Sequence, residues 1–215
     1  MSSSPIAPTS TTSSSTNSHS RSERIALIAC GAIAEPCAAL AASNGWPVDV
    51  HPLPPLLHNR PEVIAARVRE TAVALRDSYA RVAVGYADCG TYGALDRVCT
   101  ELGLHRMEGL HCYDAFAGAS RIEQFFAEQP GTYVLTDFLV RSFRRTIVQE
   151  LGLDRFPDLR DTYFANYTRV VWLAQQPTDE LRTLAAAAAD VLQLPLTVVE
   201  TGLGGLERSL AALVG

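Results

Sequence analysis

Short apolar runs alternate with segments of helical periodicity along most of the chain. The alternation favours an α/β fold, in which a mostly parallel, Rossmann-like sheet is covered by helices on both faces. The apolar runs predict six β-strands, over residues 25–29, 48–53, 81–90, 106–110, 131–140 and 196–201. The helical periodicity predicts helices ending at Ala42 and Tyr79, helices over about 93–102, 138–150, 161–176 and 178–191, and a terminal helix after residue 205.

The size and composition of the chain suit one globular domain. The 215 residues, 47% of them hydrophobic, can build a core without a disulfide or a structural metal, so a bound metal would serve chemistry. Residues 1–22 contain ten Ser and four Thr, which predicts a disordered tail. A single α/β domain is then expected over residues 23–215.

Charge and cysteine usage exclude several classes of function. All 18 basic residues are Arg, and the absence of Lys excludes Schiff-base enzymes and P-loop phosphate binding. The net charge of -5, without a basic stripe, argues against nucleic-acid binding. No apolar stretch reaches the roughly 20 residues that span a membrane. The odd number of irregularly spaced cysteines indicates reduced thiols and a cytoplasmic protein.

Four of the predicted strands finish in or near a reactive side chain. These side chains are Cys30, Cys89, the pair His111 and Cys112, and Asp137. Because parallel strands end at one edge of a sheet, we expect the three cysteines to meet there. Three thiolates repel one another unless a cation lies among them. The pattern therefore predicts a metal site, and thiolate ligands favour zinc or an iron–sulfur cluster.

The remaining polar residues near these strand ends are candidates for catalysis. Three thiolates leave a fourth position for His58, His111, a water or a small-molecule substrate. His58, His111, Glu35, Asp88 and Asp137 are candidates for acid–base chemistry. Cys37 and Cys99 lie in predicted helices and are expected to be core residues outside the site.

Glycines and one arginine are candidates for binding a cofactor or an anion. Gly31 and Gly90 directly follow thiols and precede helices, so helix amides can point at the sulfur atoms. Gly202 and Gly204 lie in a turn that opens the terminal helix. Arg141 lies one helical turn after Asp137 and could hold a carboxylate or phosphate.

Two other functions fit the same residues. In the first, the protein is a metal-free thiol enzyme, with Cys89 or Cys112 as nucleophile and His111 or His58 as its base. In the second, it is an accessory protein that delivers a metal centre to an enzyme. In a further interpretation, the cysteines have no chemical role and only pack in the core.

Several sequence blocks together resemble a known family. They are ACGAIAE (29–35), LLHNRP (56–61), YADCGTYGALD (86–96), GLHCYDAFAG (109–118), TDFLVRSF (136–143), YFANYTRVVWLAQ (163–175) and TGLGGLE (201–207). The chain is similar to the domain-of-unknown-function family 1638 of bacteria and archaea. Ala87 and Asp114 depart from its usual YGDCG and HCYE patterns. Some members are encoded near corrinoid-dependent methyl-transfer systems, so the resemblance implies one-carbon metabolism and a corrinoid or methyltransferase partner.

Overall fold

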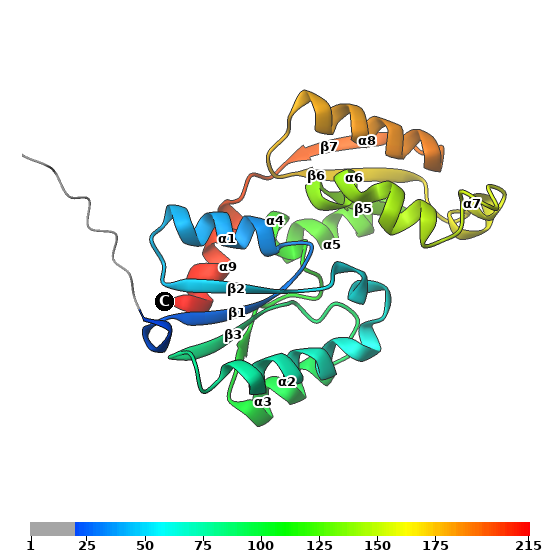
Figure 1. Ribbon diagram of the computed structural model, residues 1–215. Helices are drawn as coiled ribbons and strands as arrows, with labels where there is room; N and C mark the ends of the chain where they lie inside the picture. The colour runs from blue at the N-terminus through cyan, green and yellow to red at the C-terminus, as the bar shows by residue number, and fades with distance from the viewer. Residues whose placement is uncertain (1–19) are drawn as a thin grey trace, which may run out of the picture.

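The computed structural model describes residues 20–215 (Figure 1). The predicted tail therefore lies outside the described residues up to residue 19, whereas Ser20 caps a short 3₁₀ turn over Arg21–Glu23. No helix within residues 20–215 has the length and apolar character needed to cross a membrane.

The described residues form seven strands and nine α-helices, joined by short turns. The strands are β1 (Ile25–Cys30), β2 (Val48–Leu53), β3 (Arg81–Gly85), β4 (His105–Arg106), β5 (Thr132–Thr136), β6 (Arg169–Ala174) and β7 (Leu196–Glu200). The helices are α1 (Ala34–Ser43), α2 (Ile64–Leu75), α3 (Ala94–Leu102), α4 (Asp114–Ala117), α5 (Ala119–Glu128), α6 (Asp137–Phe143), α7 (Leu159–Tyr163), α8 (Asp179–Leu192) and α9 (Gly204–Val214). Short 3₁₀ turns cover Pro55–Asn59 and Pro61–Val63, and a π-helix covers Arg144–Gln149.

The strands divide between two parallel sheets. One sheet has the order β2-β1-β3-β4 and the other has the order β5-β6-β7. Every strand pairing in both sheets is parallel. The α/β class is thus confirmed, whereas the single sheet of six strands is wrong. In Figure 1 the two sheets lie at opposite ends of the molecule, with α4 and α5 between them.

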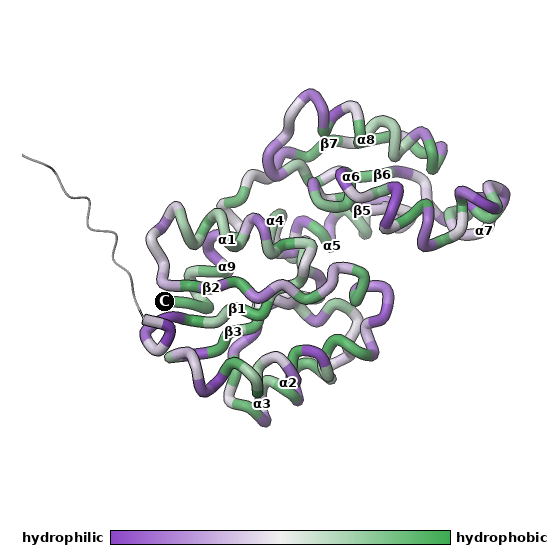
Figure 2. The backbone as a smooth tube through the Cα atoms, in the orientation of Figure 1, coloured by the Kyte–Doolittle hydropathy of each residue, from purple (hydrophilic) through white to green (hydrophobic). Residues whose placement is uncertain are grey.

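Helices cover both faces of the first sheet. In Figure 1, α1 and α9 lie on one side of β1 and β3, and α2 and α3 lie on the other. All residues of β1 are consequently buried, as expected for a central parallel strand. Figure 2 shows this strand as mostly hydrophobic, whereas hydrophobic and hydrophilic residues alternate along α2. Leu206, Leu210 and Leu213 of α9 complete the core. The chain thus returns to its first sheet, which is consistent with one domain over residues 23–215.

The second sheet explains the largest error in the predicted elements. Residues 161–176 were expected to be one helix, but they hold α7 and then β6. Val170, Trp172 and Ala174 pack on the α6 and α8 side, whereas Val171 and Leu173 pack on the α5 side. A strand buried on both faces has no polar alternation, so its apolar run resembles a buried helix.

Three predicted strands end earlier than expected. β3 stops at Gly85 and is followed by a loop over residues 86–93, and β4 holds two residues. β5 stops at Thr136, because the Thr136 hydroxyl accepts a hydrogen bond from the Leu139 amide and caps α6. The helices α4 and α5 were not predicted. Because these strands end early, the residues after them form the loops that carry the candidate site.

Candidate functional site

Each strand of the first sheet is followed by one member of a buried side-chain cluster. Cys30 ends β1, His58 follows β2, Cys89 follows β3 and Cys112 follows β4. The Sγ atoms of Cys89 and Cys112 are 3.1 Å apart. Cys112 also interacts electrostatically with Cys30, as does His58 with Cys89. The structure thus brings the three sulfurs and His58 together, and we call these four residues the thiol cluster.

The strand order places the thiol cluster where parallel sheets usually bind ligands. β1 is central, with β2 on one side and β3 on the other. The chain therefore reverses its direction of winding between β1 and β3, and the loops after these strands part from each other. Cys30 and Cys89 belong to these two loops, so the cluster lies at the topological switch point.

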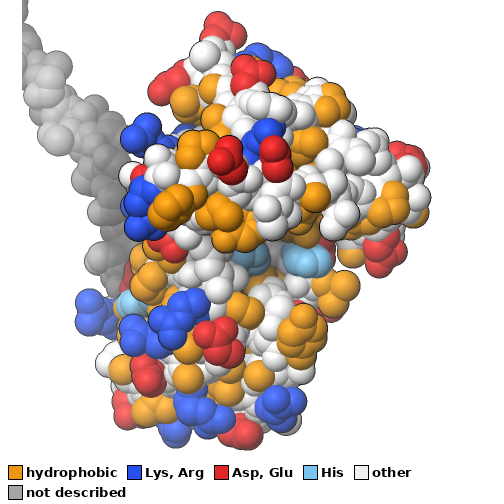
Figure 3. Space-filling model, turned by 90° about the vertical axis from the view of Figure 1, so that its right-hand side faces the viewer, with side chains coloured by type: hydrophobic (Ala, Val, Ile, Leu, Met, Phe, Trp, Pro, Cys, Tyr) orange, Lys and Arg blue, Asp and Glu red, His pale blue; other side chains and the backbone are white. Residues whose placement is uncertain are grey.

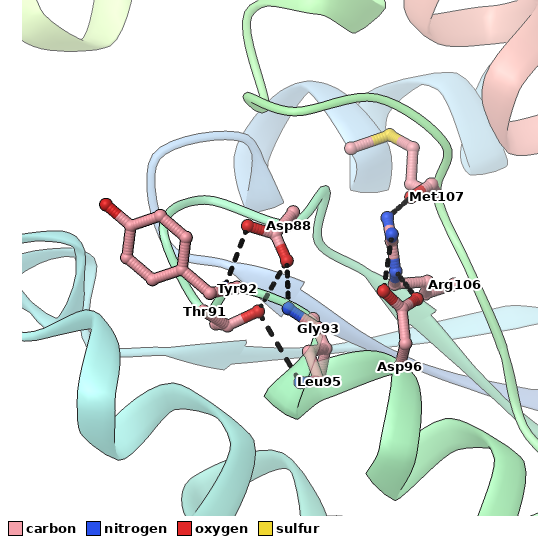
Figure 4. Close-up of polar contacts among 8 residues, drawn as sticks. All are labelled: Asp88, Thr91, Tyr92, Gly93, Leu95, Asp96, Arg106 and Met107. Atoms are coloured by element: carbon pink, nitrogen blue, oxygen red, sulfur yellow. Dashed lines mark hydrogen bonds and ion pairs between the residues drawn. The ribbon is translucent and has the colours of Figure 1, made fainter.

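A carboxylate fixes the loop that carries Cys89. Asp88 accepts hydrogen bonds from the Thr91 hydroxyl at 2.8 Å and from the amides of Gly93 and Tyr92 at 3.0 and 3.1 Å (Figure 4). Burial opposes ionisation of Asp88, but these donors and the Gly90 amide outweigh it and lower its pKa. The carboxylate thus holds a loop in which Cys89 has a left-handed backbone, with φ 49°.

A second carboxylate fixes the loop that carries Cys112. Asp114 is buried and accepts hydrogen bonds from the amides of Leu110 and His111 at 2.8 and 3.0 Å. The Cys89 amide donates in turn to the Leu110 carbonyl at 2.7 Å. The two thiol-bearing loops are therefore joined through their backbones. Asp114 supports Cys112 from outside the cluster.

The bidentate ion pair between Arg106 and Asp96 anchors the short strand β4. Arg106 Nε and Nη2 lie 2.6 and 3.2 Å from the two oxygens of Asp96, and Arg106 Nη1 donates to the Met107 carbonyl at 2.7 Å (Figure 4). Because β4 has two residues, this side-chain anchor helps to fix the path into the Cys112 loop.

Hydrogen bonding favours an anionic sulfur in the thiol cluster. The bond with Cys112, reinforced by His58 and the Cys112 amide, lowers the pKa of Cys89 to about 5 against the effect of burial. The bond with Cys112 and the Ala32 amide also lowers the pKa of Cys30. The hydrogen bond with Cys89 raises the pKa of His58, so imidazolium and thiolate stabilise each other.

The pKa values of the other three thiols are raised. The bonds with Cys30 and Cys89, together with burial, raise the pKa of Cys112 well above its ordinary value. Cys112 has one proton and can donate it to one sulfur at a time. Burial raises the pKa of Cys37 to about 12 and also raises the pKa of Cys99. Both lie on helices, as predicted.

A buried tyrosine points at the thiol cluster without a partner. Tyr86 directly follows β3 and is fully buried. Among the side-chain atoms of the described residues, its hydroxyl is the one buried polar atom without a hydrogen bond of ordinary geometry. Burial, followed by the nearby sulfurs of Cys30 and Cys112, raises its pKa. An unpaired buried hydroxyl costs about 1 to 3 kcal/mol.

A cavity of about 380 Å³ opens beside the thiol cluster, between the two sheets. Cys30, Cys112, His58 and His111 line the wall from the first sheet, whereas Cys89 does not reach it. Figure 3 shows histidine side chains in the hollow between the two halves of the molecule. The opposite wall comes from β5, α6, the π-helix and neighbouring residues: Phe126, Thr132, Tyr133, Val134, Thr136, Phe138, Leu139, Thr146, Ile147 and Tyr167.

The structure places the other catalytic candidates outside the thiol cluster. His111 lines the cavity and stacks on Tyr113, with ring centroids 4.6 Å apart. Asp137 is buried and accepts hydrogen bonds from Trp172 Nε1 and from the amides of Gln175 and Gln176. Its carboxylate is thereby engaged with β6 and the residues after it.

Glu35 is likewise separate from the sulfur atoms. It is exposed on α1 and lines a neighbouring cavity together with Arg141 and Asp137. Arg141 thus faces the cleft between α1 and α6, away from the thiol cluster. The acid–base roles of these residues stay predictions, and their positions argue against direct contact with the sulfurs.

The candidate glycines affect the path of the backbone near the site. A Cβ atom at Gly31 would lie 2.5 Å from the Leu53 carbonyl oxygen and 2.8 Å from Pro55 Cδ, so the chain after β2 passes too close for a side chain. Gly90 has φ 83° in the Cys89 loop. Gly202, with φ 62°, and Gly204 lie in the turn into α9, beyond the thiol cluster.

The side chains as they stand do not form a metal cage. Among the described residues, no group of three or more His, Cys, Asp or Glu side chains has an arrangement that could hold a metal ion. The 3.1 Å between the Cys89 and Cys112 sulfurs suits a shared proton. Two thiolates on a tetrahedral zinc lie about 3.8 Å apart, with bonds of about 2.3 Å. A metal would therefore require these two sulfurs to separate by about 0.7 Å.

Two parts of the site were absent from the sequence prediction. Tyr86 gave no signal, because an apolar residue after a strand usually packs in the core. The aromatic wall of Tyr133, Phe138 and Tyr167 depends on the second sheet, which was not predicted.

The fold and the site together define an α/β protein with buried thiols at the switch point of a parallel sheet. The chain belongs to the family described as protein of unknown function (DUF1638), whose model matches residues 52–210. The resemblance found in the sequence is thereby confirmed. No curated protein and no solved structure matches the chain.

Proposed function

We propose that Cys30, Cys89 and Cys112 bind a zinc ion or an iron–sulfur centre that acts on a small molecule in the adjoining cavity, with His58 or that molecule in the fourth position. The convergence of three sulfurs and one imidazole from four consecutive strands carries this proposal. Metal binding would displace the thiol protons and replace their hydrogen bonds with metal–sulfur bonds. All five cysteines are free thiols, which supports our proposal of a reducing, cytoplasmic location.

The accessibility of the sulfurs favours a metal over a thiol nucleophile. Cys89 has the strongest support for a thiolate, because it contacts both Cys112 and His58. It is buried and does not line the cavity. A nucleophile must reach its substrate, whereas a metal ligand needs to reach only the metal. Cys30 and Cys112 do line the cavity, so a metal held by all three sulfurs would lie next to it.

The metal content of protein purified without oxygen tests the proposal. We expect a stoichiometric metal, measured by elemental analysis. Optical and electron-spin spectra then distinguish an iron–sulfur centre, which absorbs visible light, from colourless zinc. Protein that contains no stoichiometric metal and cannot be loaded with zinc or reconstituted with iron and sulfide would refute the proposal.

The metal-free thiol enzyme is a second candidate, favoured because Cys30 and His58 both line the cavity and interact electrostatically. Its nucleophile would be Cys30 in place of Cys89 or Cys112, because Cys30 both lines the cavity and has a lowered pKa. In metal-free protein we expect iodoacetamide to label Cys30 before Cys89 and Cys112, as read by peptide mass spectrometry. Under the metal proposal, prior loading with metal should slow this labelling by at least about tenfold. Equal labelling of loaded and metal-free protein would instead support the thiol enzyme.

Replacement of Tyr86 by Phe should maintain or raise the stability of the protein but weaken its metal binding. Without metal, Tyr86→Phe removes an unpaired buried hydroxyl, so urea unfolding should show equal or greater stability, by up to about 1 kcal/mol. With metal, the hydroxyl can donate to a bound thiolate, so competition with a chelator should show about tenfold weaker binding. A variant that binds metal as tightly as the wild type would contradict this role.

The partner inferred from the family resemblance, a corrinoid-dependent methyltransferase, stays a prediction. The accessory role also stays a prediction, and it differs in one measurable respect. A delivery protein would pass its metal to an acceptor protein within minutes, whereas a resident catalytic metal would stay bound.

A further inference from the structure

We infer that the cavity beside the thiol cluster binds a neutral, mostly apolar small molecule whose single donor atom faces the cluster. This deepens the proposed function by naming the class of ligand, and its second step rests on the metal proposal. Of the residues that line the cavity, none is Arg, Asp or Glu, and the chain has no Lys. The lining residues that can ionise near neutral pH, the histidines and the thiols, all lie on the wall from the first sheet, so a charged ligand would find no ionic partner elsewhere in the cavity.

The groups on the wall from the second sheet offer little to a polar ligand. The Thr132 hydroxyl already donates to the Gln129 carbonyl at 2.6 Å and accepts from Arg169 Nε at 2.8 Å. The Thr136 hydroxyl caps α6, and the Thr146 hydroxyl donates to the Ser142 carbonyl. The three threonine hydroxyls therefore already make hydrogen bonds within the protein.

Aromatic rings give this wall a rigid and largely apolar surface, although it includes the tyrosines Tyr133 and Tyr167. Tyr133 packs edge-on against Tyr167, with centroids 5.2 Å apart at 88°, and against Phe164 at 5.3 Å. Such pairs hold their rings in fixed orientations. A cavity of roughly 150 Å³ accommodates benzene. The cavity of about 380 Å³ therefore has room for a body of up to about two rings.

The histidines and thiols of the cavity lie at its other end. His58, His111 and the sulfurs of Cys30 and Cys112 are on the wall from the first sheet. His58 interacts with Cys89. The ligand should thus place its apolar body against the aromatic wall and its donor atom near the thiol cluster. Thiolate-bound metals favour soft donors, so this atom is a sulfur rather than an oxygen.

A panel of compounds with one benzene ring tests the charge selectivity in metal-free protein. By calorimetry, benzyl alcohol should bind with a stoichiometry of one and at least tenfold more tightly than benzoate or benzylamine. Ile147→Trp and Leu56→Trp, on opposite walls, should each abolish binding by filling the cavity, with folding checked by circular dichroism. Val191→Trp, on an exposed face of α8, should bind as the wild type does. Equal binding of the charged compounds, no binding of benzyl alcohol, or binding unaffected by both filling variants would overturn the inference.

A second pair of compounds tests the direction of the donor atom. Phenylmethanethiol should bind at least tenfold more tightly than benzyl alcohol to metal-loaded protein, and within about threefold of it in metal-free protein. No difference on loaded protein would overturn the placement of the donor atom. Failure of the chain to bind metal would refute the proposed function alone, because the first panel needs no metal.

Discussion

Replacement of Cys30, Cys89 or Cys112 by Ala should abolish stoichiometric metal binding. Each substitution removes one of three sulfurs that lie together in the thiol cluster. A metal that loses one thiolate also loses charge balance and geometry, so affinity should fall by more than about 100-fold. Elemental analysis after equilibration with one equivalent of metal measures this directly.

The remaining two cysteines give matched controls. Cys37 and Cys99 are buried on α1 and α3, and burial raises the pKa of both. Cys37→Ala and Cys99→Ala should lower stability modestly, by about 1 kcal/mol, through the small space left in the core. Their metal content should match that of the wild type. Similar metal loss in all five variants would mean that the thiol cluster is not the binding site.

Replacement of Gly31 by Ala should strongly destabilise the protein and disturb the site together. The added Cβ would lie 2.5 Å from the Leu53 carbonyl oxygen and 2.9 Å from the Pro55 nitrogen, and neither backbone atom can rotate away. The chain after β2 must shift, and this segment carries His58. We expect a loss of about 2 to 4 kcal/mol in the free energy of unfolding, measured in urea.

Gly204→Ala is a control that distinguishes steric conflict from the general effect of adding a methyl group. The nearest atom to a Cβ at Gly204 is the end of the flexible Arg208 side chain, at 3.7 Å. Gly204→Ala should therefore leave stability within about 0.5 kcal/mol or raise it slightly, because Ala favours helix. If the two variants were equally stable, the close contact between Gly31 and the chain after β2 would not be real.

The sequence predicted the first half of the site because the first sheet follows local rules. Strand ends at Cys30 and near Cys89 and Cys112 are visible as apolar runs followed by glycine or by reactive residues. The common edge of parallel strands then requires the residues to meet. The same rules could not separate His58 from His111. His58 joins the cluster through the path of a proline-rich turn, which sequence periodicity does not describe.

The second half of the site depends on tertiary structure that periodicity did not reveal. Trp172 and its neighbours in β6 are buried on both faces, so the strand was taken for a helix and one sheet was expected in place of two. The cavity wall of Tyr133 and Tyr167 was missed with it. Asp137 was expected at the site because it follows a strand, but that strand belongs to the second sheet.

X-ray absorption at the edge of the bound metal tests the central claim most directly, because it counts the atoms around the ion. For zinc, the account predicts three sulfur neighbours at about 2.3 Å and one nitrogen or oxygen neighbour at about 2.0 Å. For iron, it predicts a sulfur shell that includes bridging sulfide and an iron neighbour. A spectrum with oxygen and nitrogen neighbours alone would show that the metal binds elsewhere, and the thiol cluster would then be a metal-free centre.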